Sequence, residues 1–129
     1  MFLYHGSNVE VKEPKIIKSK RLLDFGTAFY LTSDFEQAKK WAIRTTERRE
    51  VGVPTISVFS INKNEIEKLH SLTFDRADKE WLRYISLNRT EKSAGDSYDL
   101  VVGPVANDQA IRKTEKSLSI LEFREAKFV

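Results

Sequence analysis

Cysteine is absent from this chain of 129 residues, so disulfides, zinc thiolate sites and thiol nucleophiles are excluded. Histidine occurs only twice, which leaves few nitrogen ligands, and we expect no metal site. The N-terminus carries no basic segment followed by an apolar run, and no apolar stretch approaches the roughly 18 residues of a membrane span. These absences predict a cytoplasmic protein without a membrane-spanning helix.

The length predicts a single domain over residues 1–129, large enough to bury one core. The net charge of +3 lies in the first part of the chain, because residues 1–50 hold 10 Lys and Arg against 7 Asp and Glu, whereas residues 51–129 hold 12 of each. A basic cluster precedes a turn at residues 24–26, and it suits either a solvated loop or contact with phosphates or nucleic acid. The cluster consists of Lys12, Lys15, Lys18, Lys20 and Arg21.

The first stretch with the chemistry of a site is residues 3–7. The apolar and aromatic side chains before His5 favour a half-buried strand, and Gly6 has no Cβ, so a ligand or another backbone can come close. A neutral His5 offers one donor and one acceptor. Such a ring suits a ribose hydroxyl, acid–base work or a strand-end histidine bonded to backbone.

A second stretch, residues 24–32, carries Gly26 ahead of Phe29 and Tyr30. Successive strand side chains alternate between faces, so we expect one ring in the core and the other toward a cleft. Gly26 permits a bend where the loop meets the strand. Together, the two stretches indicate a nucleotide pocket.

The other elements follow from periodicity and capping signals. Ser33 and Glu36 fit a capping box for a helix running to about residue 48 with Trp41 in its apolar stripe. An alternating, half-buried strand is predicted at 55–61. Further strands are predicted at 71–74, at 98–102 where Gly103 and Pro104 stop the strand, and at 118–123, with edge strands at 16–17 and 126–129. One or two helical turns are predicted within 63–69, and a helix at 78–87 with Trp81, Leu82 and Ile85 inward. A mobile loop is predicted at 90–97. His70 is expected to be structural or exposed.

The fold class is therefore α+β, with a mainly antiparallel split sheet and two principal helices. The sequence resembles the ADP-ribosyltransferase fold, whose members carry His-Gly-Ser/Thr on one core strand and a Tyr on the next. More closely, it is similar to the uncharacterised bacterial family called domain of unknown function 3990. The matching residues are 4–7, 24–26 with 29–32, Ala38 with Trp41 and Ala42, Trp81 and Leu82 with Asn88 and Arg89, and 98–104.

The resemblance implies NAD as a substrate and glycosyl transfer as the reaction, namely mono-ADP-ribosylation of an unknown acceptor. His5 would then hold the adenosine-side ribose, Gly6 backbone groups would bind the nicotinamide amide, and Tyr30 would stack on the nicotinamide ring. The remaining residues of the implied NAD site are Ser7, Gly26, Phe29 and Asn88.

The third motif position of that fold is usually a glutamate on a late strand. Gln109 corresponds to it here, ahead of the alternating run toward residue 123. A neutral amide can bond ribose hydroxyls but gives no charge stabilisation, whereas a carboxylate stabilises an oxocarbenium-like ribose. Asp108 or Glu115 would have to supply that carboxylate.

Two other functions remain open from the residues. A nucleotide-binding sensor without catalysis would keep the pocket and lack the acid. A domain that binds or modifies nucleic acid would use the basic cluster together with Arg44, Arg48 and Arg49, mainly through phosphate contacts because aromatic residues do not interleave with these cations. The acceptor could be protein, nucleic acid or a small molecule.

Overall fold

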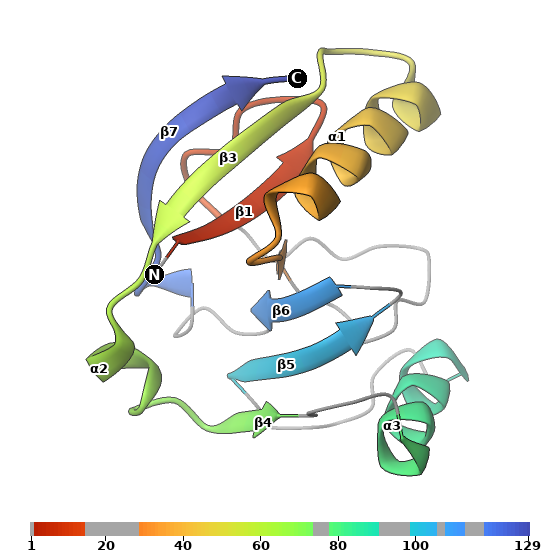
Figure 1. Cartoon of the computed structure of the whole chain (residues 1–129), viewed down its shortest axis with the longest axis vertical. Helices are drawn as coiled ribbons and strands as arrows, with labels where there is room; N and C mark the ends of the chain where they lie inside the picture. The colour runs from red at the N-terminus through yellow and green to blue at the C-terminus, as the bar shows by residue number, and fades with distance from the viewer. Residues whose placement is uncertain (1, 15–28, 74–77, 91–98, 106–107, 113–117) are drawn as a thin grey trace.

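The computed structural model describes residues 2–14, 29–73, 78–90, 99–105, 108–112 and 118–129 (Figure 1). This part of the chain forms two sheets, a three-stranded one in the order β1-β3-β7 and a four-stranded one in the order β2-β6-β5-β4. The elements in chain order are β1 (Phe2–Ser7), β2 (Phe29–Leu31), α1 (Phe35–Arg49), β3 (Thr55–Ser60), α2 (Lys63–Ile66), β4 (Ser71–Thr73), α3 (Lys79–Thr90), β5 (Leu100–Val105), β6 (Asp108–Arg112) and β7 (Glu122–Phe128).

The predicted fold class, α+β with a mainly antiparallel sheet, is confirmed. Four of the five strand pairs are antiparallel, and β4 with β5 is parallel. The described part of the structure has three helices, namely the longer α1 and α3 and the short α2, which forms within the turns predicted at 63–69. The predictions at 16–17 and 24–28 and most of the predicted loop at 90–97 lie outside the described residues.

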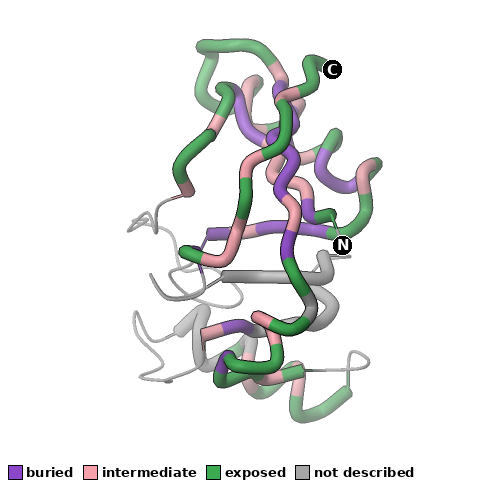
Figure 2. The backbone as a smooth tube through the Cα atoms, turned by 90° about the vertical axis from the view of Figure 1, so that its left-hand side faces the viewer, coloured by how far each residue is buried: buried purple, intermediate pink, exposed green. Residues whose placement is uncertain are grey.

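β3 was expected to be half-buried, and this is wrong: its first five residues are buried. It is the central strand of its sheet, and both of its faces are covered. On one face Ala38 and Ala42 of α1 pack with Ile56 and Val58. On the other face, Phe59 joins Leu3, Phe29, Leu31, Ile61 and Leu118 in what we call the aromatic cluster. Figure 2 colours the buried parts of the backbone purple and the exposed parts green.

α1 begins one residue later than the capping box predicts. Asp34, rather than Ser33, is the N-cap, and its Oδ1 accepts a hydrogen bond from the Glu36 amide at 3.0 Å. This side chain satisfies one of the amides that a helix start leaves unpaired. Trp41 is half-buried instead of central in the apolar stripe, because Ala38 and Ala42 form the closest contact with the sheet.

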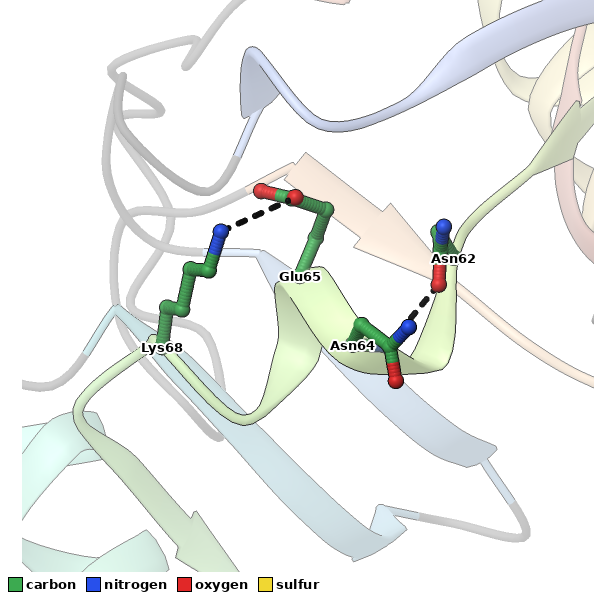
Figure 3. Close-up of polar contacts among 4 residues, drawn as sticks. All are labelled: Asn62, Asn64, Glu65 and Lys68. Atoms are coloured by element: carbon green, nitrogen blue, oxygen red, sulfur yellow. Dashed lines mark hydrogen bonds and ion pairs between the residues drawn. The ribbon is translucent and has the colours of Figure 1, made fainter.

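α2 and α3 have polar N-terminal caps. At α2 the backbone N–H of Asn64 donates to Asn62 Oδ1 at 2.9 Å, and Lys68 Nζ pairs with Glu65 Oε1 at 3.2 Å (Figure 3). At α3 the Trp81 amide donates to Asp78 Oδ1 at 3.0 Å. Exposed pairs such as Lys68 with Glu65 contribute little stability, so we attribute the placement of α2 to Ile66, which packs against the core.

The inward face predicted for α3 is partly wrong, since Leu82 is 57% exposed. Trp81 and Tyr84 are both half-buried. These two residues are three positions apart and therefore share a helix face, whereas Leu82 lies about 100° around the helix from Trp81.

The strand predicted at 118–123 is confirmed only at its end, since residues 122 and 123 begin β7 whereas residues 118–121 form no strand. Leu118 is buried in the aromatic cluster, and a turn closes there as the Leu121 amide donates to the Leu118 carbonyl at 3.1 Å. The apolar residues of this segment therefore fill the core from a turn. The strand follows as β7 and includes most of the edge predicted at 126–129.

β5 starts two residues later than predicted and continues through Gly103 and Pro104. Its pairing with β6 shifts register between Val102 and Val105, and its pairing with β4 ends at Val102. A proline that cannot donate a ladder hydrogen bond is tolerated at such an irregularity. β6, which then returns antiparallel to both β5 and β2, was not predicted.

Candidate functional site

The two sheets meet where β1 lies beside β2. The Tyr4 amide donates to the Thr32 carbonyl at 2.8 Å, and the Thr32 amide donates to the Tyr4 carbonyl at 2.9 Å. This exchanged pair joins an edge strand of one sheet to an edge strand of the other. Among the described residues no further backbone hydrogen bond joins β1 to β2, so the ladder between the two strands consists of this pair.

The exchanged pair also determines where the neighbouring backbone groups point. Along an antiparallel edge strand, alternate residues direct both their N–H and C=O to opposite sides. Since the groups of Tyr4 point to β2, those of Gly6 point the same way, and those of Leu3 and His5 point to β3. By the same argument from Thr32, the groups of Tyr30 point toward β1. The main chains of Gly6 and Tyr30 therefore face each other across the junction.

The His5 side chain, from β1, contacts two residues of β2 at this junction. Its Nδ1 lies 2.8 Å from the Tyr30 carbonyl oxygen, and its ring stacks on Phe29 with centroids 4.2 Å apart and planes 21° apart. A carbonyl oxygen accepts hydrogen bonds and cannot donate, so Nδ1 carries the proton and a neutral ring leaves Nε2 as an acceptor. The ring is positioned both by a hydrogen bond and by an aromatic contact.

The His5 ring is neutral over a wide pH range. Burial lowers the pKa of His5 from 6.5 to about 4, opposed by the hydrogen bond to Tyr30 and assisted by the positive charge of Arg49. Burial removes water from the imidazolium, which is the charged form. Near neutral pH, His5 is therefore a hydrogen-bond acceptor at Nε2 and not a cation.

Gly6 was predicted to allow close approach of a ligand or of another backbone, and the structure shows the backbone of α1 there. A Cβ at this position would lie 2.1 Å from the Ala38 carbonyl oxygen and 2.8 Å from the Ala42 amide nitrogen. The space left by the missing side chain is thus filled by the backbone of α1 and not by a ligand. The Gly6 N–H and C=O still point to the junction with β2, and no described residue of another element bonds them on that side.

Phe29 and Tyr30 alternate as strand geometry requires. Phe29 is 3% exposed and belongs to the aromatic cluster, while Tyr30 is half-buried. Ser7 is buried and its hydroxyl donates to Asn8 Oδ1 at 3.3 Å. The structure therefore brings His5, Gly6, Phe29 and Tyr30 together at one junction, whereas Ser7 pairs with Thr55 of β3 and bonds Asn8.

The third motif position lies on the neighbouring strand. Gln109 follows Asp108, the first residue of β6, and precedes Ala110, which pairs with Leu31 of β2. Gln109 and Ile111 occupy alternate positions of β6, and Ile111 is the residue that pairs with Tyr30. β6 therefore holds Gln109 close in register to Tyr30, although the sequence analysis placed it before a strand and not within one.

Other predicted residues are not brought to this junction or lie elsewhere. Asn88 belongs to α3, which lies beside β4 and β5 and away from β1 (Figure 1). Gly26 and Glu115 lie outside the described residues, as do four members of the basic cluster, Lys15, Lys18, Lys20 and Arg21. Lys12, Arg44, Arg48 and Arg49 are exposed, and His70 is exposed as predicted.

Sequence reasoning missed two residues that shape the site. Arg49, at the end of α1, donates from a guanidinium nitrogen to Asn8 Oδ1 at 2.9 Å, and the side-chain Nδ2 of Asn8 donates to the Val51 carbonyl at 3.0 Å. Asn8 thereby fixes the end of α1 beside the end of β1, with the charge of Arg49 near His5. No local pattern announces a contact between residues about 41 positions apart.

The family can now be stated from comparison with known proteins. The sequence matches the model of a family described as "Protein of unknown function (DUF3990)" over residues 1–125. The chain belongs to this family. No curated protein and no solved structure shows significant similarity to it. Within the described ranges, no helix of this family member is both long and apolar enough to cross a bilayer.

We expect His5 to make stability pH-dependent. Its pKa is 6.5 in the unfolded reference and about 4 in the folded chain, so the unfolded state binds more protons between these values. The stabilisation is complete above pH 6.5 and is lost as the pH falls toward 4, by no more than about 3 kcal/mol. Urea unfolding of wild type and His5→Gln from pH 4 to 7.5 measures the difference.

Imidazole resonances in NMR give the matching titration. Removal of the nearby charge in Arg49→Gln should raise the pKa of His5, and it should remain below 6.5 because burial is the largest cause. The argument fails if wild-type His5 titrates near 6.5, or if His5→Gln and wild type lose stability in parallel.

Proposed function

We propose that this chain binds NAD at the junction of β1 and β2 and transfers ADP-ribose from it to an acceptor. The observation that carries the proposal is the main-chain arrangement at Gly6, whose N–H and C=O point toward β2 and form no backbone hydrogen bond with it among the described residues. The resemblance to ADP-ribosyltransferases supports the choice of NAD and of the reaction.

A primary carboxamide is the natural partner for such a residue. Nicotinamide carries one C=O and one NH₂ side by side, and an outward-facing residue of an antiparallel edge offers one N–H and one C=O. Two hydrogen bonds of the ladder type can therefore form between Gly6 and the amide. Backbone donors and acceptors of this kind orient a ligand without any movement of side chains.

His5 and Tyr30 complete the proposed site. Nε2 of the neutral His5 accepts a hydrogen bond from a ribose hydroxyl, while its Nδ1 remains bonded to the Tyr30 carbonyl. The Tyr30 ring, half-buried on β2, stacks on the nicotinamide. Burial, assisted by the charge of Arg49, lowers the pKa of His5 and keeps the imidazole unprotonated, so the acceptor state persists across neutral pH.

The reaction breaks the bond between ribose C1′ and the nicotinamide nitrogen, and both electrons leave with nicotinamide. The ribose acquires oxocarbenium character, the acceptor nucleophile forms the new bond to C1′, and its proton is released to a base. Asp108, Gln109 and Glu115 are the proposed source of stabilisation for the cationic ribose. A carboxylate acts through its charge, and an amide acts through hydrogen bonds to ribose hydroxyls.

A second candidate function is an NAD-binding module without transfer. The observation that favours it is the neutral Gln109 on β6, two positions along the strand from Ile111, which pairs with Tyr30. Contact with nucleic acid through the basic cluster is a third, and it predicts a steep decrease of affinity with salt, with a log–log slope of about −0.7 to −0.9 per neutralised phosphate.

Calorimetry with NAD and an assay of nicotinamide release distinguish these functions. We expect the wild type to bind NAD, and Tyr30→Ala and His5→Gln each to bind it about tenfold more weakly, as lost stacking or one lost hydrogen bond predicts. His70→Gln makes the same substitution at an exposed histidine and should bind as the wild type does.

The two measurements have separate consequences. Binding with release of nicotinamide, and with labelled ADP-ribose on an acceptor from a lysate, supports transfer. Binding without release removes transfer and leaves the binding module. If the folded wild type does not bind NAD, or if both site variants bind as tightly as His70→Gln, the proposed site is wrong.

A further inference from the structure

β7 forms an open edge of the three-stranded sheet. It pairs with β3 on one side, and no strand of the described ranges pairs with its other side. Figure 1 shows β7 on the outside of its sheet, with the C-terminus at its end. Five of its seven residues are exposed, and Phe128 is 76% exposed. Such an edge can pair with another strand.

The direction of the free backbone groups on β7 follows from the rest of the sheet. Tyr4 points away from β3, so Leu3 and His5 bond with Phe59 and Ser57, their partners on β3. The intervening residues Ile56 and Val58 then bond with Lys127 and Glu125. Ala126, between them, directs its N–H and C=O outward.

A second copy of this chain can pair with that edge in few ways. When two identical antiparallel strands pair around a two-fold axis perpendicular to the sheet, one residue lies opposite its own copy. Centring the axis on Arg124, Glu125 or Lys127 places like charges opposite each other, which is destabilising. Centring it on Phe123 or Phe128 leaves at most three residues of the strand in the pair, given its bounds.

Centring on Ala126 avoids both problems. Glu125 then lies opposite the partner's Lys127, and Lys127 opposite the partner's Glu125, on one face of the sheet. These are the closely spaced pairs in which side chains interact best. Ala126 exchanges its outward N–H and C=O with its own copy.

The charges are already arranged for this pairing. Within one chain Lys127 Nζ lies 3.4 Å from Glu125 Oε1, with the side chains 51% and 57% exposed. Both residues therefore sit on the same face and remain open to a second partner. Because the other long registers oppose like charges, the same residues that permit this pairing discourage alternative ones.

We propose that β7 pairs with β7 of a second copy, antiparallel and centred on Ala126, to make a continuous six-stranded sheet across a dimer. The pairing adds three strands from each copy. It leaves the junction of β1 and β2 on the far side of each three-stranded sheet, so dimerisation and the proposed NAD site are independent.

Sedimentation equilibrium on the full chain over a range of concentrations tests the proposal. We expect a reversible dimer of the wild type, and a dissociation constant about tenfold higher for Glu125→Lys and for Lys127→Glu, each of which opposes like charges. The double exchange Glu125→Lys with Lys127→Glu restores opposite charges and should restore the dimer. A mixture of the two single variants should form a heterodimer.

Backbone pairing is tested separately at the centre of the strand. Ala126→Pro removes the outward N–H, which β3 does not use, and should give a folded monomer by circular dichroism. Ala126→Ser keeps the N–H and should still dimerise. A wild type that stays monomeric up to about millimolar concentration, far above the dissociation constant of a specific dimer, overturns the proposal. So does a dimer that these variants leave unchanged.

Discussion

Replacement of Gly6 by alanine is expected to destabilise the folded chain by about 3 kcal/mol or more, because an added methyl group in a well-packed site forces backbone shifts. The new Cβ would meet the Ala38 carbonyl oxygen at 2.1 Å and the Ala42 amide nitrogen at 2.8 Å. Both atoms belong to the backbone of α1, so no side-chain rotation relieves the clash. Urea unfolding monitored by circular dichroism measures the loss.

Lys40→Ala is a suitable control, since Lys40 is exposed on the same helix and its truncation should change stability by no more than about 0.5 kcal/mol. If Gly6→Ala is as stable as this control, the close packing of β1 against α1 is wrong. If such a stable Gly6→Ala variant also lost NAD binding, the loss would be attributed to the proposed contact between the Gly6 main chain and the ligand.

The second large effect is expected for Phe59→Ala, at about 3–5 kcal/mol, the usual cost of truncating a buried phenylalanine. Phe59 is fully buried, and its ring packs edge-on against Phe29 with centroids 6.0 Å apart and against Phe123 at 5.8 Å. These three rings come from β3, β2 and β7, so the cavity would weaken contacts between the two sheets.

Phe2→Ala makes the same substitution at a residue that is 54% exposed, and it should cost about 1 kcal/mol or less. Thermal unfolding of both variants gives the comparison. Equal losses from the two would show that the aromatic cluster around Phe59 is not the core.

Elements with a strong local signal were predicted well. The apolar run before His5 forms β1, the residues after Asp34 form α1, and the alternating run at 55–61 forms β3. Alternation also predicted one of the rings of Phe29 and Tyr30 in the core, and in the structure Phe29 is buried while Tyr30 is half-buried. These patterns depend on neighbours within a few residues, which a single sequence contains.

Elements that depend on distant partners were missed. β6 has no run of β-branched or aromatic residues, and it is a strand because β2 and β5 flank it on both sides. Leu118 and Ile120 alternate with Ser119 as strand residues would, yet the segment 118–121 turns against the core instead. For the site, the residue types at 5, 6 and 30 indicated the junction, while the contact of Arg49 with Asn8 depends on folding of segments far apart.

The junction of β1 and β2 presents the main-chain N–H and C=O of Gly6, and these groups are common to every amino acid except proline, which lacks the N–H. Alanine scanning of the strands would leave these hydrogen-bonding groups in place and would register Gly6 as a packing position. Ester replacement of the amide at residue 6, by chemical ligation or an α-hydroxy acid, deletes the N–H without adding a Cβ. The proposed recognition of NAD at this junction can therefore be tested by changing backbone atoms, whereas side-chain substitutions leave those atoms in place.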